Sequence, residues 1–425
     1  MKIYYKFTDF INEELQVDNL ENFVFEGGAA GHMKHPFDDN SLTFADFKTI
    51  VRSALQGGLD FEQQPAEKTD GQNLFASVRD GKAIFSRNKG QLIAPLDLNG
   101  IIKMFADHQV PLVRETYVTA AKDLAKALPK IKDQSVFDGG KNFINMEVIN
   151  IKNPNVINYD KGNLLQFHNL TYTDGNGNVL GDDQSVGTEL FKAIEKVKAN
   201  VQKNYTIIPP QILKLAKDVN FDERVGYYEK KIDKLRDTYG LSDQDEVKMY
   251  HEAWWRNQIE ENFADLDPAI KEGLLLRWAY LDKKTLNMRD LKKAVTPEQA
   301  KAVKDFDGQR NIKYKENILP FENLFLELGS DVLKNASNFV AASPDEEKSR
   351  LQNQIRTEAE KIKKNGDLKQ IAKVEKELKR LEGIGGIESI MPTEGIVFRY
   401  KGKTFKLTGT FAAINQLMGI IKYGR

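Results

Sequence analysis

Cysteine is absent from this chain of 425 residues. Its absence excludes disulfides, thiolate zinc sites and a cysteine nucleophile, and it favours the reducing interior of a cell. Long apolar runs are also missing, since none approaches the about 18 residues that a membrane-spanning helix needs. Residues 1–5 lack the apolar stretch of a secretory signal peptide. We therefore expect a cytoplasmic protein that does not bind a membrane.

Neither sign of charge is in excess, because 62 Lys and Arg residues balance 62 Asp and Glu residues. A balanced total does not exclude nucleic acid as a partner, because a local basic groove can exist within it. The composition, 40% hydrophobic and 29% charged, is that of an ordinary globular protein. The length predicts roughly two to three domains.

A β-hairpin is predicted over residues 73–86. Two apolar segments, 73–78 and 83–86, are separated by a tetrapeptide that contains Asp80-Gly81, and Asp-Gly between strand-like segments is a strong hairpin signal. Lys68 stands just before the first segment, so we expect it in a tight turn that opens the hairpin.

Lys68 is a candidate nucleophile. A lysine attacks only in its neutral form, which nearby cations and partial desolvation favour. Arg87 and Lys89 follow the second strand and would supply positive charge and grip phosphates if they fold over the same pocket. Gly71 would let the backbone approach a ligand closely. The alternative is a surface turn with a stray lysine.

Lys68-x-Asp70-Gly71 resembles motif I of the covalent nucleotidyltransferases, which comprise the ATP-dependent RNA and DNA ligases and the capping enzymes. The Arg87-x-Lys89-Gly90 that follows resembles the form seen in phage-type RNA ligases. The resemblance implies that Lys68 forms a lysyl-AMP with ATP and Mg²⁺. It also implies that Glu67 helps to read the adenine edge, and that Asp70 bonds the nucleotide or orients Lys68.

Residues 142–149, 156–159 and 163–170 read as three strands of an antiparallel meander. Glu147 lies inside an apolar strand, where an unpaired carboxylate is costly, so a basic side chain, a metal or a ligand hydroxyl is implied as its partner. This order resembles motifs III and IIIa of the same superfamily. The resemblance implies that Glu147 lies near the nucleotide sugar and the metal, and that Phe167, or alternatively His168, stacks on the adenine. The alternative interpretation is that these are ordinary core residues of a meander.

A second hairpin is predicted near the end of the chain, where Glu394-Gly395-x-Val397 precedes a glycine turn and a strand that carries Lys406. These residues resemble motifs IV and V, which implies that Glu394 helps to hold the metal and that Lys406 grips the α-phosphate. The usual motif V is Lys-x-Lys, but Thr408 stands where the second lysine is expected. Lys403 or Lys401 would have to substitute from the turn.

The predicted fold is α+β, an antiparallel-sheet nucleotidyltransferase (ligase adenylation) domain with a large all-α insertion. An amphipathic helix over residues 43–57 and two helices within 98–127 accompany the strands. Helical periodicity then continues through residues 190–201, 210–216, 227–238, 245–263, 268–281, 297–306 and 346–381, and the tryptophans there are expected in its core. The predicted division is a region 1–58 of helix and loop, core 59–184, insertion 185–384 and core 385–425.

The glycine-rich stretch before residue 40 has two interpretations. His32 and His35 with Asp38 and Asp39 offer metal-binding side chains, or the histidines cap and fill an ordered loop. The sequence leaves both open.

The expected function is that of an ATP-dependent polynucleotide ligase that seals 5′-phosphate to 3′-hydroxyl ends, with RNA preferred to DNA as the partner. The preference rests on the Arg-x-Lys-Gly form and on the lack of an evident OB-fold after Thr408. The alternatives are a nucleotide-binding structural or interaction protein of a phage, and a transferase of AMP to a protein or small molecule. A viral chain would act in the host cytoplasm. Oligomeric state is not predicted.

Overall fold

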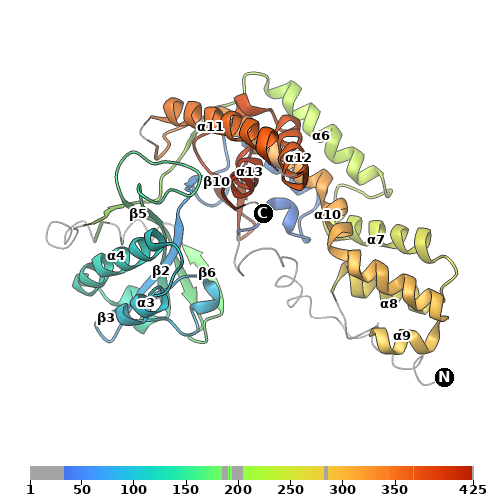
Figure 1. Cartoon of the computed structure of the whole chain (residues 1–425), viewed down its shortest axis with the longest axis horizontal. Helices are drawn as coiled ribbons and strands as arrows, with labels where there is room; N and C mark the ends of the chain where they lie inside the picture. Colours follow the sequence, from blue (N-terminus) through green and yellow to red (C-terminus); the bar gives the residue numbers. More distant parts are fainter. Residues whose placement is uncertain are drawn as a thin grey trace. The chain divides into compact units, whose positions relative to one another are not determined.

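The computed structural model describes residues 33–183, 190, 192–193, 204–281, 286–341, 343–366 and 368–423. The chain divides into two compact units. The main unit comprises Met33–Val247 and Leu319–Arg425, and the helical unit contains Lys248–Ile318 (Figure 1). His32 lies outside the described residues, as does most of the predicted helix over residues 190–201.

The main unit is built on a large, mainly antiparallel sheet in the order β3-β2-β4-β5-β6, with β7 added in parallel to β5. The strands are β2 (Gln72–Arg79), β3 (Lys82–Ser86), β4 (Asn142–Ile149), β5 (Leu164–Thr173), β6 (Val179–Asp183) and β7 (Thr206–Ile208). The predicted hairpin is confirmed as β2 and β3. Asp80 (φ 51°) and Gly81 (φ 70°) form its two-residue turn, and positive φ at both positions matches the twist of the strands.

One face of the large sheet is apolar and is covered by α3 (Leu98–Met104) and α4 (Pro111–Ala127), as predicted (Figure 1). Alternate residues of each strand point into this core, including Leu74, Met146 and Phe167. The opposite face carries the residues between them, and many of these are polar. This alternation gives the sheet one face for packing and one for a site.

A small antiparallel sheet in the order β1-β10-β11 is formed by β1 (Ala66–Lys68), β10 (Gly395–Tyr400) and β11 (Lys403–Leu407). The second predicted hairpin is confirmed as β10 and β11. The pairing of β1 with β10, Lys68 opposite Gly395, joins segments far apart in the sequence. Arg399 of β10 donates to the backbone oxygen of Asp182 in β6 at 2.8 Å, which ties this sheet to the large one.

Helices from the predicted insertion pack into the main unit. α11 (Pro344–Asn365) and α12 (Leu368–Gly383) share one core with α13 (Phe411–Tyr423) and with residues of β4 and β5. Val340 and Leu326, from the same insertion, belong to this core as well. Residues 185–384 therefore do not form one separate body.

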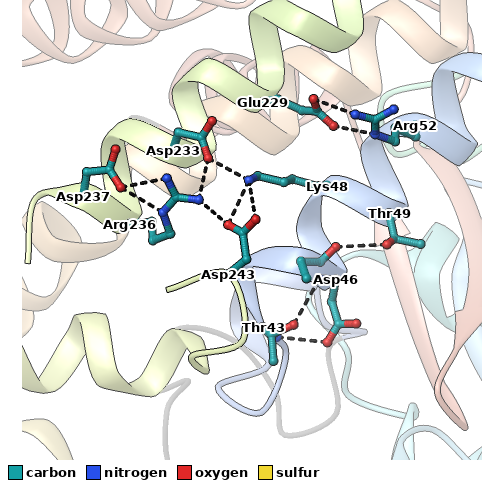
Figure 2. A network of polar contacts seen from close by, with 11 residues as sticks. Thr43, Asp46, Lys48, Thr49, Arg52, Glu229, Asp233, Arg236, Asp237 and Asp243 are labelled. Atoms are coloured by element: carbon teal, nitrogen blue, oxygen red, sulfur yellow. Dashed lines mark hydrogen bonds and ion pairs between the residues drawn. The ribbon is translucent and has the colours of Figure 1, made fainter. Parts of the chain in front are cut away.

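The contact between α2 (Phe44–Gln56) and α6 (Phe221–Asp237) also joins the predicted insertion to the rest of the main unit (Figure 2). Lys48 of α2 forms ion pairs with Asp233 at 2.7 Å and with Asp243 at 2.8 Å, and Arg52 pairs with Glu229 at 2.5 Å. α2 itself begins and ends as predicted, with Thr43 accepting from the N–H of Asp46 and with Gly57 in a left-handed conformation.

The helical unit contains α8 (Pro268–Ala279), α9 (Met288–Ala294), nearly all of α7 (Val247–Phe263) and the first part of α10 (Pro297–Lys334). Trp255 and Trp278 are buried in its core and Trp254 packs against them, as predicted. In the part of the chain that the structure describes, no helix combines the length and apolarity needed to cross a membrane.

Two local predictions were wrong. Residues 156–159 form no strand, because the backbone N–H groups of Val156 and Ile157 donate to the carboxylate of Asp70 instead of to a neighbouring strand. Residues 210–216 are not helical. They are extended, with β8 (Lys214–Leu215) paired to β9 (Ala336–Ser337) and Ile212 bridged to Ala66. The α+β class with antiparallel sheets is confirmed.

Candidate functional site

Lys68 lies where the small β1-β10-β11 sheet adjoins the large sheet. It is the last residue of β1 in the small sheet, and β2 of the large sheet begins at Gln72. The lysine is therefore at a strand end, and not in the turn of a hairpin as predicted. Its side chain is 18% exposed, and its Nζ lies 2.6 Å from Oε1 of Glu394, which is also 18% exposed.

The charges closest to Lys68 are negative. Burial disfavours its ammonium form, but the carboxylates of Glu394, Glu147 and Asp70 outweigh burial, and the pKa of Lys68 is raised above its ordinary value. The prediction that neighbouring cations favour neutral Lys68 was wrong for this ligand-free arrangement. A positive charge placed among these carboxylates would reverse the shift.

Gly395 brings Glu394 to this position. Its φ is 154°, and a Cβ there would collide with the backbone oxygen of Leu407 on the neighbouring strand. Only glycine, which has no Cβ, allows the start of β10 to lie this close to the end of β11. The residue that follows Glu394 in the motif is thus fixed by the packing of the small sheet.

The large sheet contributes a row of polar side chains on the face opposite its apolar core. Asn73 of β2, Glu147 of β4 and Gln166 of β5 are paired across the three strands. Asn73 Oδ1, Glu147 Oε2 and both amide atoms of Gln166 are buried without a hydrogen-bond partner. Burial raises the pKa of Glu147 to about 8, although Lys68 opposes that shift. Buried polar atoms without partners are rare in folded proteins, so an ordered water, an ion or a ligand is expected beside these atoms.

Phe167 and His168, the two residues predicted to stack on adenine, point to opposite faces. Phe167 is fully buried in the apolar core with α4, so its ring does not face Lys68. His168 lies at an irregularity in the β4–β5 pairing and is influenced by the charge of Lys68. Burial, with a smaller contribution from Lys68, lowers the pKa of His168 to about 3, so its ring is neutral.

Asp70 anchors a loop. Its Oδ2 accepts the N–H groups of Val156 at 2.6 Å and Ile157 at 2.9 Å, and its own N–H donates to Tyr159 Oη at 2.8 Å. These contacts hold the loop at residues 156–159 against the start of the large sheet. Both predicted roles of Asp70, bonding the nucleotide and orienting Lys68, stay predictions.

Gly71 is required by packing. A Cβ at this position would lie 3.0 Å from the backbone oxygen of Val148 and 3.2 Å from Oε2 of Glu147. This close approach is made to β4, and the predicted approach of the Gly71 backbone to a ligand stays a prediction.

Glu67 is fully buried and its Oε2 accepts the N–H of Val340 at 2.5 Å. Burial raises the pKa of Glu67 to about 8. Because neighbouring strand residues alternate in direction, Glu67 and Lys68 point to opposite sides of β1. The structure does not bring the Glu67 side chain to the Lys68 site.

Lys406 joins the site but Lys403 does not. Burial and the charge of Lys68 lower the pKa of Lys406, while Glu394 opposes the shift. Lys403 forms an ion pair with Asp39 at 2.8 Å, and Lys401 forms one with Asp46 at 2.8 Å. The two lysines predicted to replace the missing one in motif V are thus held by carboxylates elsewhere.

Arg87 lies at the edge of the polar row. Its guanidinium carbon is 5.8 Å from the ring centre of Tyr117, whose hydroxyl donates to the backbone oxygen of Asn73 at 3.4 Å. Lys89 is exposed in a short turn, and its side chain forms no hydrogen bond or ion pair with the described residues of the site. Of this predicted pair, Arg87 is the one connected to the row.

Further residues at the site had no sequence signal that assigned them to Lys68. His35 and Asp38 lie beside β11, because the N–H of Lys406 donates to the backbone oxygen of Lys34 at 2.9 Å. The N–H of His35 donates to Asp38 Oδ2 at 2.8 Å, so this loop is ordered by local capping, one of its two interpretations. Among the described residues there is no group of three or more His, Asp or Glu side chains arranged for a metal.

Comparison with protein-family models, with curated proteins and with solved structures finds no match for this chain. Only the geometry of the site and the motifs therefore bear on the function of the chain.

Proposed function

We propose that the protein is a covalent nucleotidyltransferase, an ATP-dependent polynucleotide ligase in which Lys68 accepts AMP. The observation that carries the proposal is the convergence on Lys68 of Glu147 from β4, Lys406 from β11 and Glu394 from the residue before β10, beside buried polar atoms without partners. Such a set of charges around an enclosed lysine is unusual for a purely structural lysine.

Lys68 would act as the nucleophile. Its Nζ lone pair forms a bond to the α-phosphorus of ATP while the bond to pyrophosphate breaks, and one Nζ proton leaves to solvent. Lys406 offsets charge on the α-phosphate, and the polar row holds the nucleoside. The phosphoramidate then passes AMP to a 5′-phosphate, and a 3′-hydroxyl displaces it to join the strand, with RNA preferred to DNA.

Glu147 and Glu394 fit Mg²⁺, because carboxylate oxygens are its preferred protein ligands and Oε2 of Glu147 lacks a partner. When bound, the ion would offset phosphate charge and the carboxylate charge that keeps Lys68 protonated. Lys68 and Glu394 must then separate, so their ion pair belongs to the ligand-free state.

Labelling with α-³²P-ATP and Mg²⁺ tests the proposal. The wild-type protein should acquire an acid-labile label at Lys68, located by mass spectrometry of its peptides, and pyrophosphate should remove it. Lys68→Ala and Lys68→Arg should acquire none, since guanidinium stays protonated and cannot attack phosphorus. Lys68→Arg is the sharper control, because it retains a positive charge beside Glu394. Absence of label from folded wild-type protein would overturn the proposal.

A second function, nucleotide binding without catalysis, is favoured by one observation. The structure pairs Lys68 with Glu394 and provides no second lysine at motif V, where Thr408 stands. Under this reading ATP would stabilise the protein against heat, but no covalent adduct would form. The same labelling experiment, run beside a thermal melt with ATP, separates the two functions.

A further inference from the structure

The segment before α2 forms a side of the Lys68 site that the motifs do not include. Lys34 bridges Phe405 in parallel, so the segment runs alongside β11. The ring of His35 stacks on Phe37 with centres 4.9 Å apart and planes inclined by 16°. Phe37 is itself buried against Phe325. The position of the imidazole is therefore fixed by packing.

Three polar atoms in this region are buried and have no hydrogen-bond partner: Nδ1 of His35, Oδ1 of Asp38 and Nε of Arg380 in α12. The cations whose charges act on the His35 ring are Lys406, Lys68 and Arg380. Burial first, and then these cations, lower the pKa of His35 well below its ordinary value, so the ring is neutral. A neutral imidazole enclosed among three cations has a free nitrogen available to a ligand.

The charge balance favours an anion as that ligand. Lys68 is paired with Glu394, and Arg380 is paired with Glu322 and with Glu377. Lys406 forms no ion pair with any residue in the described part of the chain. A largely enclosed cation without a counter-ion is costly, and an anion bound beside it removes that cost.

We propose that His35, Lys406 and Arg380 form a subsite for the diphosphate end of a nucleoside triphosphate, the part that leaves as pyrophosphate. The inference rests on the proposed function and extends it. Lys406 would hold the phosphate next to Lys68, Nε–H of Arg380 would donate to an oxygen of the phosphates beyond it, and the free Nδ1 of His35, whose ring bonds to the backbone of Lys406, would accept from a protonated oxygen of those phosphates. Polyphosphate recognition by several convergent N–H donors is well suited to this geometry.

The carboxylates whose charges act on this subsite are Glu394 and Asp38, which act on Lys406, and Glu322, which acts on Asp38. Burial raises the pKa of Asp38 to about 7, so the group is partly protonated at neutral pH and opposes an anion less than an ordinary aspartate does. Asp38 Oδ2 also accepts from the His35 backbone, which leaves the imidazole to the ligand. Glu322 is neutralised by Arg380.

The test uses His35→Gln, which keeps the size and polarity of the residue, and His35→Ala. Each is compared with His108→Gln, a histidine that hydrogen-bonds locally at Val110. The purified AMP adduct is titrated with inorganic pyrophosphate and Mg²⁺, and separately discharged onto a 5′-phosphorylated strand. We expect the half-maximal pyrophosphate concentration to rise about tenfold or more in the His35 variants, the effect of losing one hydrogen bond to a charged group. Discharge onto the strand should change less than about twofold, since pyrophosphate takes no part in it.

A thermal melt with inorganic pyrophosphate alone keeps the two proposals separable. If the wild-type protein forms no adduct but pyrophosphate raises its Tm, and the rise is smaller in His35→Gln, the ligase proposal fails and the subsite stands. If the adduct forms and the His35 variants respond to pyrophosphate as the wild type does, the subsite is wrong. Equal losses in both half-reactions would likewise overturn it, because they would indicate a general disturbance of the site.

Discussion

The carboxylate of Glu347 accepts a hydrogen bond from the backbone N–H of Asn158 at 2.8 Å. This contact connects α11 to the loop that Asp70 binds. Arg350, paired with Glu347 at 2.5 Å, donates to the backbone oxygen of Val156 at 2.8 Å and holds the same loop. The lysine site is thus supported from a helix more than 270 residues further along the chain.

Glu347→Ala should reduce both stability and AMP uptake. It leaves the N–H of Asn158 and the guanidinium of Arg350 without their acceptor, which costs about 1–3 kcal/mol for such a buried group. Chemical denaturation and α-³²P-ATP labelling measure the two effects. Glu346→Ala, at the exposed neighbouring position, is the control and should match the wild type. Normal labelling by Glu347→Ala would show that the loop needs no support from α11.

Glu394→Gln should lower the maximal rate of adduct formation by about a hundredfold, the typical effect of losing one electrostatic stabiliser. The loss should be partly rescued by raised Mg²⁺. Because the Glu394 carboxylate raises the pKa of Lys68, its removal should also shift the acid limb of the pH–rate profile to lower pH. Rates measured from pH 5 to 10 test both effects, with Glu375→Gln on the exposed face of α12 as control. An unmoved acid limb would contradict the coupling between Glu394 and Lys68.

Glu67 should make stability depend on pH. Burial raises its pKa from about 4.5 to about 8, so the folded protein keeps a proton that the unfolded chain loses. The contribution of Glu67 to the free energy of unfolding is therefore fully present below about pH 4.5. It falls as pH rises toward 8, by several kcal/mol at most. In Glu67→Gln this part of the decline should disappear, whereas exposed Glu115→Gln should behave as the wild type. Urea denaturation at pH 5 and pH 8 measures the difference.

Replacing Lys248–Ile318 by a Gly/Ser linker should leave AMP uptake intact, because every residue assigned to that step belongs to the main unit. Transfer of AMP to a strand should weaken if the helical unit helps to hold the acceptor. Removal of residues 185–384 should instead abolish uptake, because it also deletes Val340, Glu347 and Arg350. Labelling of the larger deletion would show that the flanking helices are dispensable.

The sequence predicted the parts of the fold that local signals determine. The Asp80-Gly81 hairpin, the capped helix α2 and the strand that carries Glu147 each depend on neighbouring residues, and each was found. The partner of β1 was not predictable. β1 has three residues, too few for a periodicity, and its pairing with β10 depends on the whole main unit.

The sequence predicted which residues lie at the site more accurately than it predicted how their side chains are arranged there. Lys68, Glu147, Glu394 and Lys406 come together as their motifs suggested. The directions of Glu67 and Phe167 were not evident, because one step along a strand reverses the face to which a side chain points. The effect of the surrounding carboxylates on the pKa of Lys68 was also not predicted, because each carboxylate was assigned separately to the metal or the nucleotide.

The pairing of β1 with β10 also sets the time at which the site can exist during synthesis. Lys68 leaves the ribosome long before Glu394 is made, and at roughly 5–20 residues per second the delay is on the order of tens of seconds. Throughout that interval β1 lacks β10, and the hydrogen-bonding groups on that edge are open to other chains or to chaperones. Under the proposed function, the nascent protein therefore cannot take up AMP until the last two strands close the small sheet.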